Sequence, residues 1–261
     1  MGQIPVMLLK RIEAYNKGAR TKLYNLEYKK YIDARSSGIA AAGSLAAWVN
    51  TDKAAERVRI LLRCFGMNSK GSKLVDLVGF QKTLADINPG TIDWASSIWL
   101  PLSDSPPNIS NPVTGRSLSS ELRAMYEVLA APGAVTVSGG YVAASKAMHC
   151  LFPELAPMID GRHSGISYYN IVRQTYTPPL GVVEWAGWLG APINGVPNPS
   201  PRGQGRDSWD SKRFVLAMGV NQHIYELWQE GNGHPGLAAF LALDPSPGTT
   251  GIPRIVDKGL W

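Results

Sequence analysis

A glycine turn and an aspartate flank one predicted helix in the middle of the chain. The turn is Ser138-Gly139-Gly140, and Asp160 follows twenty residues after Gly140. Glycine lets the backbone approach a ligand closely, and the amide groups at the start of the next helix suit the binding of one phosphate. A fixed carboxylate can stabilise a positive charge in a transition state, or activate a water or an amine. We therefore treat the turn and Asp160 as the candidate site.

Two more side chains on the same predicted helix bear on this chemistry. Lys146 can act as a nucleophile only when its amine is neutral, which desolvation beside an apolar helix face would favour. It is equally well explained as a surface lysine whose stem covers apolar neighbours. His149 is better explained as a core histidine than as an acid–base group. The simpler interpretation of Asp160 is a helix cap, but its separation in sequence from the glycine turn favours catalysis.

The segment resembles the helix-hairpin-helix DNA glycosylases. In that family a glycine-rich hairpin holds the DNA backbone, a helix follows, and a Pro-x-x-Asp element supplies the catalytic carboxylate. Here Ser138-Gly139-Gly140 matches the hairpin, and Pro157-Met158-Ile159-Asp160 matches the Pro-x-x-Asp element at the same separation. The Asp160-Gly161 pair is most similar to the adenine glycosylase version. The clear resemblance covers about residues 130–175, and the earlier helices carry no motif.

The sequence departs from the family pattern in two places. Bifunctional members carry a lysine two residues after the last hairpin glycine, where this chain has Val142. Lys146 lies one helical turn later on the same face. The resemblance therefore implies either that Lys146 is a displaced nucleophile, giving weak abasic-site lyase activity, or that water attacks. The four-cysteine iron–sulfur motif of many relatives is also missing, as it is in the oxoguanine-type members.

What the resemblance implies is an enzyme that flips a damaged or modified base out of double-stranded DNA and cleaves its N-glycosidic bond. Asp160 would stabilise the sugar cation or activate the nucleophile. The implied DNA-binding residues are Ser138, Gly139, Gly140, Arg162 and His163. Aromatic pocket candidates, chosen only by proximity to the motif, are Tyr168, Tyr169, Trp185 and Trp188.

The identity of the base is left open by the sequence. The poor match outside the motif suggests an unusual substrate such as a hypermodified phage base, either in genome repair or in antiviral defence. We expect no cofactor, although the family resemblance leaves room for a monovalent cation at the hairpin.

Helical periodicity dominates the rest of the chain, and few segments alternate with period two, so we predict a mainly α protein. The resemblance implies two helical lobes around a cleft. Residues 101–116 hold four prolines and are the best candidate seam. We predict a basic N-terminal helical region over 1–100, a Pro-rich connection over 101–117, and a catalytic region with C-terminal helices over 118–261. The predicted helices are 6–34, 39–48, 52–65, 72–87, 91–100, 119–131, 141–152 and 211–230.

The charge of the chain is uneven. Residues 1–73 carry 14 Lys and Arg against 5 Asp and Glu, whereas the remainder carries 12 against 15, within a total of +6. A basic region of this kind suits a polyanion such as DNA, or is an ordinary solvated surface. Four tyrosines lie among the basic residues of 6–34, and at helical spacing they are better explained as core than as base-stacking platforms. They are Tyr15, Tyr24, Tyr28 and Tyr31.

Several classes of protein do not fit this composition. Only two cysteines and four histidines are present in 261 residues, which argues against a disulfide scaffold and against a bound transition metal. There is no apolar run of about 18 residues and no evident signal peptide. We therefore expect a cytoplasmic monomer without membrane association.

Two other functions compete with the glycosylase hypothesis. A noncatalytic helix-hairpin-helix DNA-binding module would use the same turn and the basic region, with Asp160 as a cap only. A protein-interaction domain would instead use the Trp- and Pro-rich segment 177–209.

Overall fold

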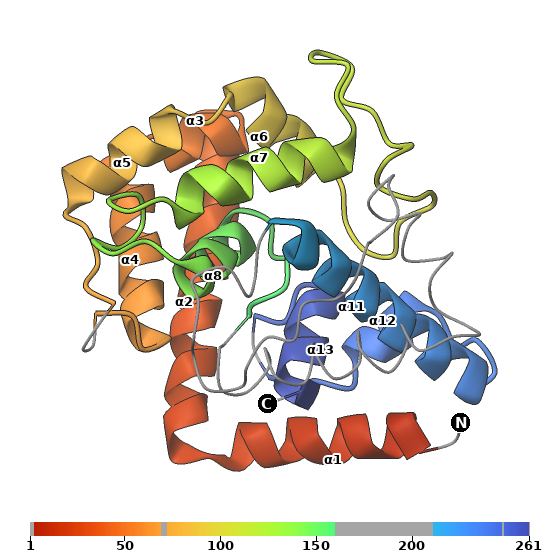
Figure 1. The fold of residues 1–261 in the computed structure, drawn as a ribbon. Helices are drawn as coiled ribbons and strands as arrows, with labels where there is room; N and C mark the ends of the chain where they lie inside the picture. Colours follow the sequence, from red (N-terminus) through yellow and green to blue (C-terminus); the bar gives the residue numbers. More distant parts are fainter. Residues whose placement is uncertain (1–2, 69–71, 160–210, 247, 261) are drawn as a thin grey trace.

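The computed structural model describes residues 3–68, 72–159, 211–246 and 248–260, and this part of the chain is mainly helical (Figure 1). Helix α2 forms a long central column, and α3 to α8 surround its C-terminal half. Helices α11, α12 and α13 gather near the N-terminal half of α2, with α1 packed across α13. The helices are α1 (Gln3–Lys17), α2 (Ala19–Ala42), α3 (Leu45–Val49), α4 (Asp52–Cys64), α5 (Leu77–Ala85), α6 (Pro89–Ser96), α7 (Leu118–Ala130), α8 (Tyr141–Leu151), α11 (Ser211–Gly231), α12 (Leu237–Leu241) and α13 (Ile252–Leu260).

The segment predicted as one helix over 6–34 is two helices that meet at Gly18. The backbone of Gly18 is extended, with ψ of 134°, and the chain changes direction sharply there. The Thr21 hydroxyl donates to the Gly18 carbonyl at 2.9 Å, which stabilises the corner. The helical pattern on either side of Gly18 does not reveal this break, so the prediction of a single helix was wrong.

The four tyrosines of α1 and α2 belong to the core. Tyr15, Tyr24, Tyr28 and Tyr31 are all buried, and the rings of Tyr24 and Tyr28 contact the ring of Phe65. The expectation of core packing rather than base stacking is therefore confirmed for these residues.

Side-chain caps fix where several helices begin. Thr51 accepts a hydrogen bond from the amide of Ala54 at the start of α4, and Asp76 accepts from Gly79 at the start of α5. Such caps satisfy amide groups that have no partner within the helix. The predicted start at residues 51–52 is confirmed, whereas the helix predicted over 72–87 begins only after Asp76.

The Pro-rich connection 101–117 is hydrogen-bonded to neighbours on both sides of it in sequence. The amide of Leu102 donates to the side chain of Gln222, after the connection, at 2.9 Å, and the side-chain amide of Asn111 donates to the hydroxyl of Thr91, before it, at 3.4 Å. Within the connection, the buried Asn111 donates to the Glu121 carboxylate at 3.4 Å. One buried apolar cluster includes residues from before and after the connection.

Among the described residues, no helix is long and apolar enough to span a lipid bilayer.

Candidate functional site

The predicted glycine turn lies between α7 and α8 and requires glycine twice. Gly139 and Gly140 have φ of 69° and 124°, a region that side-chain-bearing residues rarely adopt. A Cβ added to Gly139 would lie 2.5 Å from the carbonyl oxygen of Ala130, the last residue of α7. The amide of Gly140 donates to that same oxygen at 2.9 Å. The turn therefore closes tightly onto the end of α7 and starts α8 beside it.

Gly140 is also the N-cap residue of α8, and it has no side chain that could cap the helix. Its carbonyl accepts the first bond of the helix from the amide of Ala144 at 3.1 Å. The first-turn amide groups and the helix dipole give this end of α8 a partial positive charge. Ser138, in front of the glycines, is exposed.

The end of the basic region lies next to this turn. The amide of Val137 donates to the carbonyl of Lys73 at 2.8 Å, and Leu74 pairs with Thr136 as an isolated antiparallel bridge. The side chain of Lys73 is exposed. The backbone of Lys73, which carries one cation of the region 1–73, thus lies beside Val137, three residues before Gly140.

Lys146, the predicted nucleophile, is directed toward the end of another helix. Its side chain is only 5% exposed, and its Nζ donates to the carbonyl oxygen of Phe65 at 2.7 Å. Phe65 is the C-cap residue of α4, where the helix dipole is negative and attracts an ammonium group. The structure therefore ties Lys146 to α4.

Asp160 lies outside the described residues, but the segment that leads to it is well defined. Ile159 is buried, and its amide donates to the hydroxyl of Ser145 on α8 at 3.1 Å. Ser145 is five residues after Gly140, which is roughly 7.5 Å along a helix axis. The residue before Asp160 is therefore held near the N-terminal half of α8, on the side of the helix that carries Ser145.

His149 is fully buried and has a partner at each ring nitrogen. Nδ1 lies 2.7 Å from the carbonyl oxygen of Ala156, and Nε2 lies 2.8 Å from the hydroxyl of Tyr28. Burial lowers the pKa of His149 to about 3, with the cations Arg254 and Arg35 acting in the same direction, against the opposing bond to Ala156. This histidine is neutral at physiological pH and contributes to packing, as the sequence indicated.

The remaining predicted site residues lie outside the described part of the chain. They are the DNA-binding candidates Arg162 and His163 and the pocket candidates Tyr168, Tyr169, Trp185 and Trp188.

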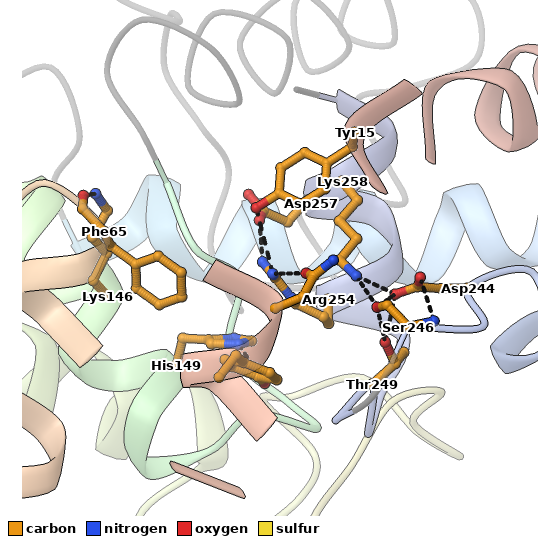
Figure 2. A network of polar contacts seen from close by, with 12 residues as sticks. Tyr15, Phe65, Lys146, His149, Asp244, Ser246, Thr249, Arg254, Asp257 and Lys258 are labelled. Carbon is orange, nitrogen blue, oxygen red and sulfur yellow. Dashed lines mark hydrogen bonds and ion pairs between the residues drawn. The ribbon is translucent and has the colours of Figure 1, made fainter. Parts of the chain in front are cut away.

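Sequence reasoning missed a buried charged network that joins both ends of the described chain (Figure 2). Three residues of α13, Arg254, Asp257 and Lys258, are buried. Lys258 donates to the carboxylate of Asp244, and Arg254 donates to Asp257 at 3.1 Å. Charged residues are usually exposed, so nothing in the α13 sequence except the i, i+3 spacing of Arg254 and Asp257 signalled a buried pair.

The network is electrostatically coupled. Burial by itself would raise the pKa of Asp244, but Lys258, Thr249 and Asn16 together hold it at about 2. Burial and the neighbouring Arg254 lower the pKa of Lys258 to about 8, although Asp244 opposes them. The guanidinium of Arg254 also lies 4.8 Å from the ring centre of Tyr28, which connects the network to His149.

Within the described ranges, no group of three or more His, Cys, Asp or Glu side chains is arranged to hold a metal ion. Comparison with protein-family models finds no match for this sequence, and comparisons with curated proteins and with solved structures find none either.

Proposed function

We propose that this protein is a DNA glycosylase that excises a damaged or modified base and leaves an abasic site. The proposal rests on one observation: after α8 ends, the chain turns back and is hydrogen-bonded to the same helix again. The glycine turn starts the helix, and Ser145 holds Ile159, the residue bonded to Asp160, against the same helix. In the proposal, the carboxylate that follows Ile159 works together with a phosphate bound at the turn before α8.

In this proposal the turn and Lys73 hold one DNA strand by its phosphates. The exposed cation of Lys73 and the first-turn amides of α8 act on the same negative charge. Two helical lobes form a cleft between them, and the target base is flipped into it. Arg162 and His163 add further phosphate contacts.

The bond that breaks joins the base to C1′ of the deoxyribose. As the base departs with the bonding electron pair and takes up a proton from solvent water, positive charge develops on the sugar, and the Asp160 carboxylate stabilises it. A water molecule adds its oxygen to C1′ and gives up a proton, for which Asp160 is the acceptor. Each of these steps proceeds without a metal or an organic cofactor.

Water is a better nucleophile than Lys146 in this site. The Nζ of Lys146 is directed to the Phe65 carbonyl at 2.7 Å, so attack by this amine on C1′ would require a buried hydrogen bond to break. We therefore propose a monofunctional enzyme. Borohydride would then trap no covalent complex between the protein and DNA.

The decisive experiment measures abasic sites as alkali-labile breaks in DNA that contains a panel of damaged and phage-type modified bases. The wild-type protein is expected to cleave at one or a few of these bases. Asp160→Asn should abolish excision while binding stays nearly intact, and the exposed Asp86→Asn should behave as the wild type. Excision retained by Asp160→Asn would refute the assignment.

A noncatalytic DNA-binding module is the alternative, and the engagement of Lys146 with Phe65 favours it as much as it favours water. The two functions share the turn and Lys73 and differ only in the role of Asp160. Salt-dependent binding that ignores base identity, with no cleavage of any modified DNA, would select the module.

A further inference from the structure

Two side chains of α8 hold the loop that precedes Asp160. Ser145 and His149 are four residues apart and share one face of the helix. The Ser145 hydroxyl accepts from the amide of Ile159 at 3.1 Å, and its own proton reaches the carbonyl of Ile159 or of Val142, each at 3.1 Å. His149 reaches Ala156. Both ends of the segment 156–159 are thus attached to α8.

The protonation of His149 follows from its two partners. A carbonyl oxygen only accepts, so Nδ1 carries the hydrogen and donates to Ala156 at 2.7 Å. In the neutral ring Nε2 must then accept, and Tyr28 donates to it at 2.8 Å. Tyr28 is itself buried, and burial raises its pKa, which keeps the phenol protonated. The carbonyl of Ala156 therefore sets the tautomer of His149, and Tyr28 on α2 satisfies Nε2.

The start of the same loop is fixed as well. The amides of Leu155 and Ala156 donate to the Phe152 carbonyl at 3.0 and 2.8 Å, which closes a compact turn after α8. The apolar side chains of Leu155, Met158 and Ile159 are buried. The segment 152–159, the arm that leads to Asp160, is thus held by hydrogen bonds and by packing along its length.

We infer that Tyr28, Ser145 and His149 are positioning residues that hold the arm 152–159 against α8 and so fix Ile159, the point from which the proposed catalytic carboxylate extends. The inference rests on the proposed function. None of the three touches the reacting atoms in this assignment. They affect the reaction rate through position. A catalytic carboxylate must stay within a few tenths of an ångström of its productive place, because a misplacement of about 1 Å can slow a reaction by about a hundredfold.

The test compares two variants of His149 that are similar in size. In His149→Asn the side-chain amide keeps a donor near the position of Nδ1, whereas His149→Leu removes it. We expect His149→Leu to slow single-turnover excision by about ten- to a hundredfold with the DNA dissociation constant within about threefold of the wild type. His149→Asn should recover most of the rate. Both variants leave a gap near Tyr28, so a merely structural role would lower their melting temperatures alike and would leave their single-turnover rates equal.

Ser145→Ala provides a second, independent variant whose readout does not depend on activity. Loss of the hydroxyl should speed hydrogen exchange at the amide of Ile159 at least tenfold, while exchange at Ala47, whose amide is capped by Ser44, should not change. Unchanged exchange at Ile159, or wild-type excision by folded His149→Leu and Ser145→Ala, would overturn the inference. If the wild-type protein excised no base from any modified DNA, the proposed function would be refuted. Hydrogen exchange at Ile159 would still show whether Ser145 holds the arm.

Discussion

The ammonium group of Lys146 on α8 and the carbonyl of Phe65 at the end of α4 are joined by a buried hydrogen bond of 2.7 Å. This bond links the helix that follows the glycine turn to the C-terminal end of a helix in the basic region. A side chain with this burial is not a solvated surface lysine, and its bond to Phe65 gives it a part in the packing of α8 on α4.

Replacement of Lys146 should therefore affect stability and leave the type of product unchanged. Lys146→Met keeps most of the apolar stem but leaves the Phe65 carbonyl buried without its donor, which costs about 1–3 kcal/mol. Urea denaturation should show a lower midpoint with an unchanged slope. Borohydride should trap no protein–DNA complex with the wild type or the variant. A trapped complex that disappears in Lys146→Met would show that the amine attacks the sugar.

A methyl group at Gly139 should distort the turn. Gly139→Ala combines a positive φ with a Cβ placed 2.5 Å from the Ala130 oxygen. Gly43→Ala is the matched control, since Gly43 has φ of 86° and open space at its Cβ among the described residues. We expect Gly139→Ala to be less stable than Gly43→Ala by roughly 1–3 kcal/mol and to bind DNA more weakly. Equal stability of the two variants in urea would contradict the tight turn.

Lys73 should contribute to DNA affinity through its charge. If it contacts one phosphate, Lys73→Gln should weaken binding and reduce the slope of log affinity against log salt by about 0.9. Lys10→Gln removes an exposed charge from α1, which packs on α13 away from the glycine turn, and should leave the slope nearly unchanged. Binding measured by fluorescence anisotropy over a range of salt concentrations distinguishes these outcomes. The same loss in both variants would mean that only total charge matters.

Asp244 should give the protein a component of stability that disappears in acid. Its pKa is about 2 in the folded protein against 3.8 ordinarily, so the folded state binds fewer protons than the unfolded state between these values. The pairing with Lys258 is fully stabilising above about pH 4 and is lost as the pH falls toward 2, a change of about 2 kcal/mol.

The comparison of Asp244→Asn with the wild type tests this expectation by urea unfolding at several pH values. The variant should be less stable at neutral pH, and the difference should shrink on acidification through this window. Asn16→Ala removes an uncharged partner of Asp244 and should be destabilised by an amount that changes less with pH. A constant gap for Asp244→Asn would show that its charge is not what stabilises the fold.

Local signals predicted much of the helical framework. The helix predicted over 119–131 is found at Leu118–Ala130, and the one predicted over 211–230 is found at Ser211–Gly231. Both helices have long apolar patterns. Helix α7 also has clear end signals, because Ser117 caps its start and Pro132 follows its end. Periodicity and caps are properties of neighbouring residues, so they can be read without the tertiary structure.

Features that depend on distant residues were not predictable in the same way. Beyond the break at Gly18, α1 packs on the distant helix α13, and the pairing of Leu74 with Thr136 joins segments 62 residues apart. The glycine turn was evident from its sequence, but the destination of the Lys146 side chain depended on where α4 ends. The buried Arg254 and Lys258 became explicable only once their partners on α1 and α2 were known.

The packing of α1 against α13 has a consequence for how the chain acquires its structure. Arg254 bonds to Asn25 across 229 residues of sequence, and Lys258 bonds to Asn16 across 242. During synthesis the polar faces of α1 and α2 emerge long before the segment that covers them. Contacts of such long sequence separation slow folding, because a large loop must close before they form. Helices α1 and α2 are thus completed by α13, so this part of the core forms only after residues 252–260 have been made.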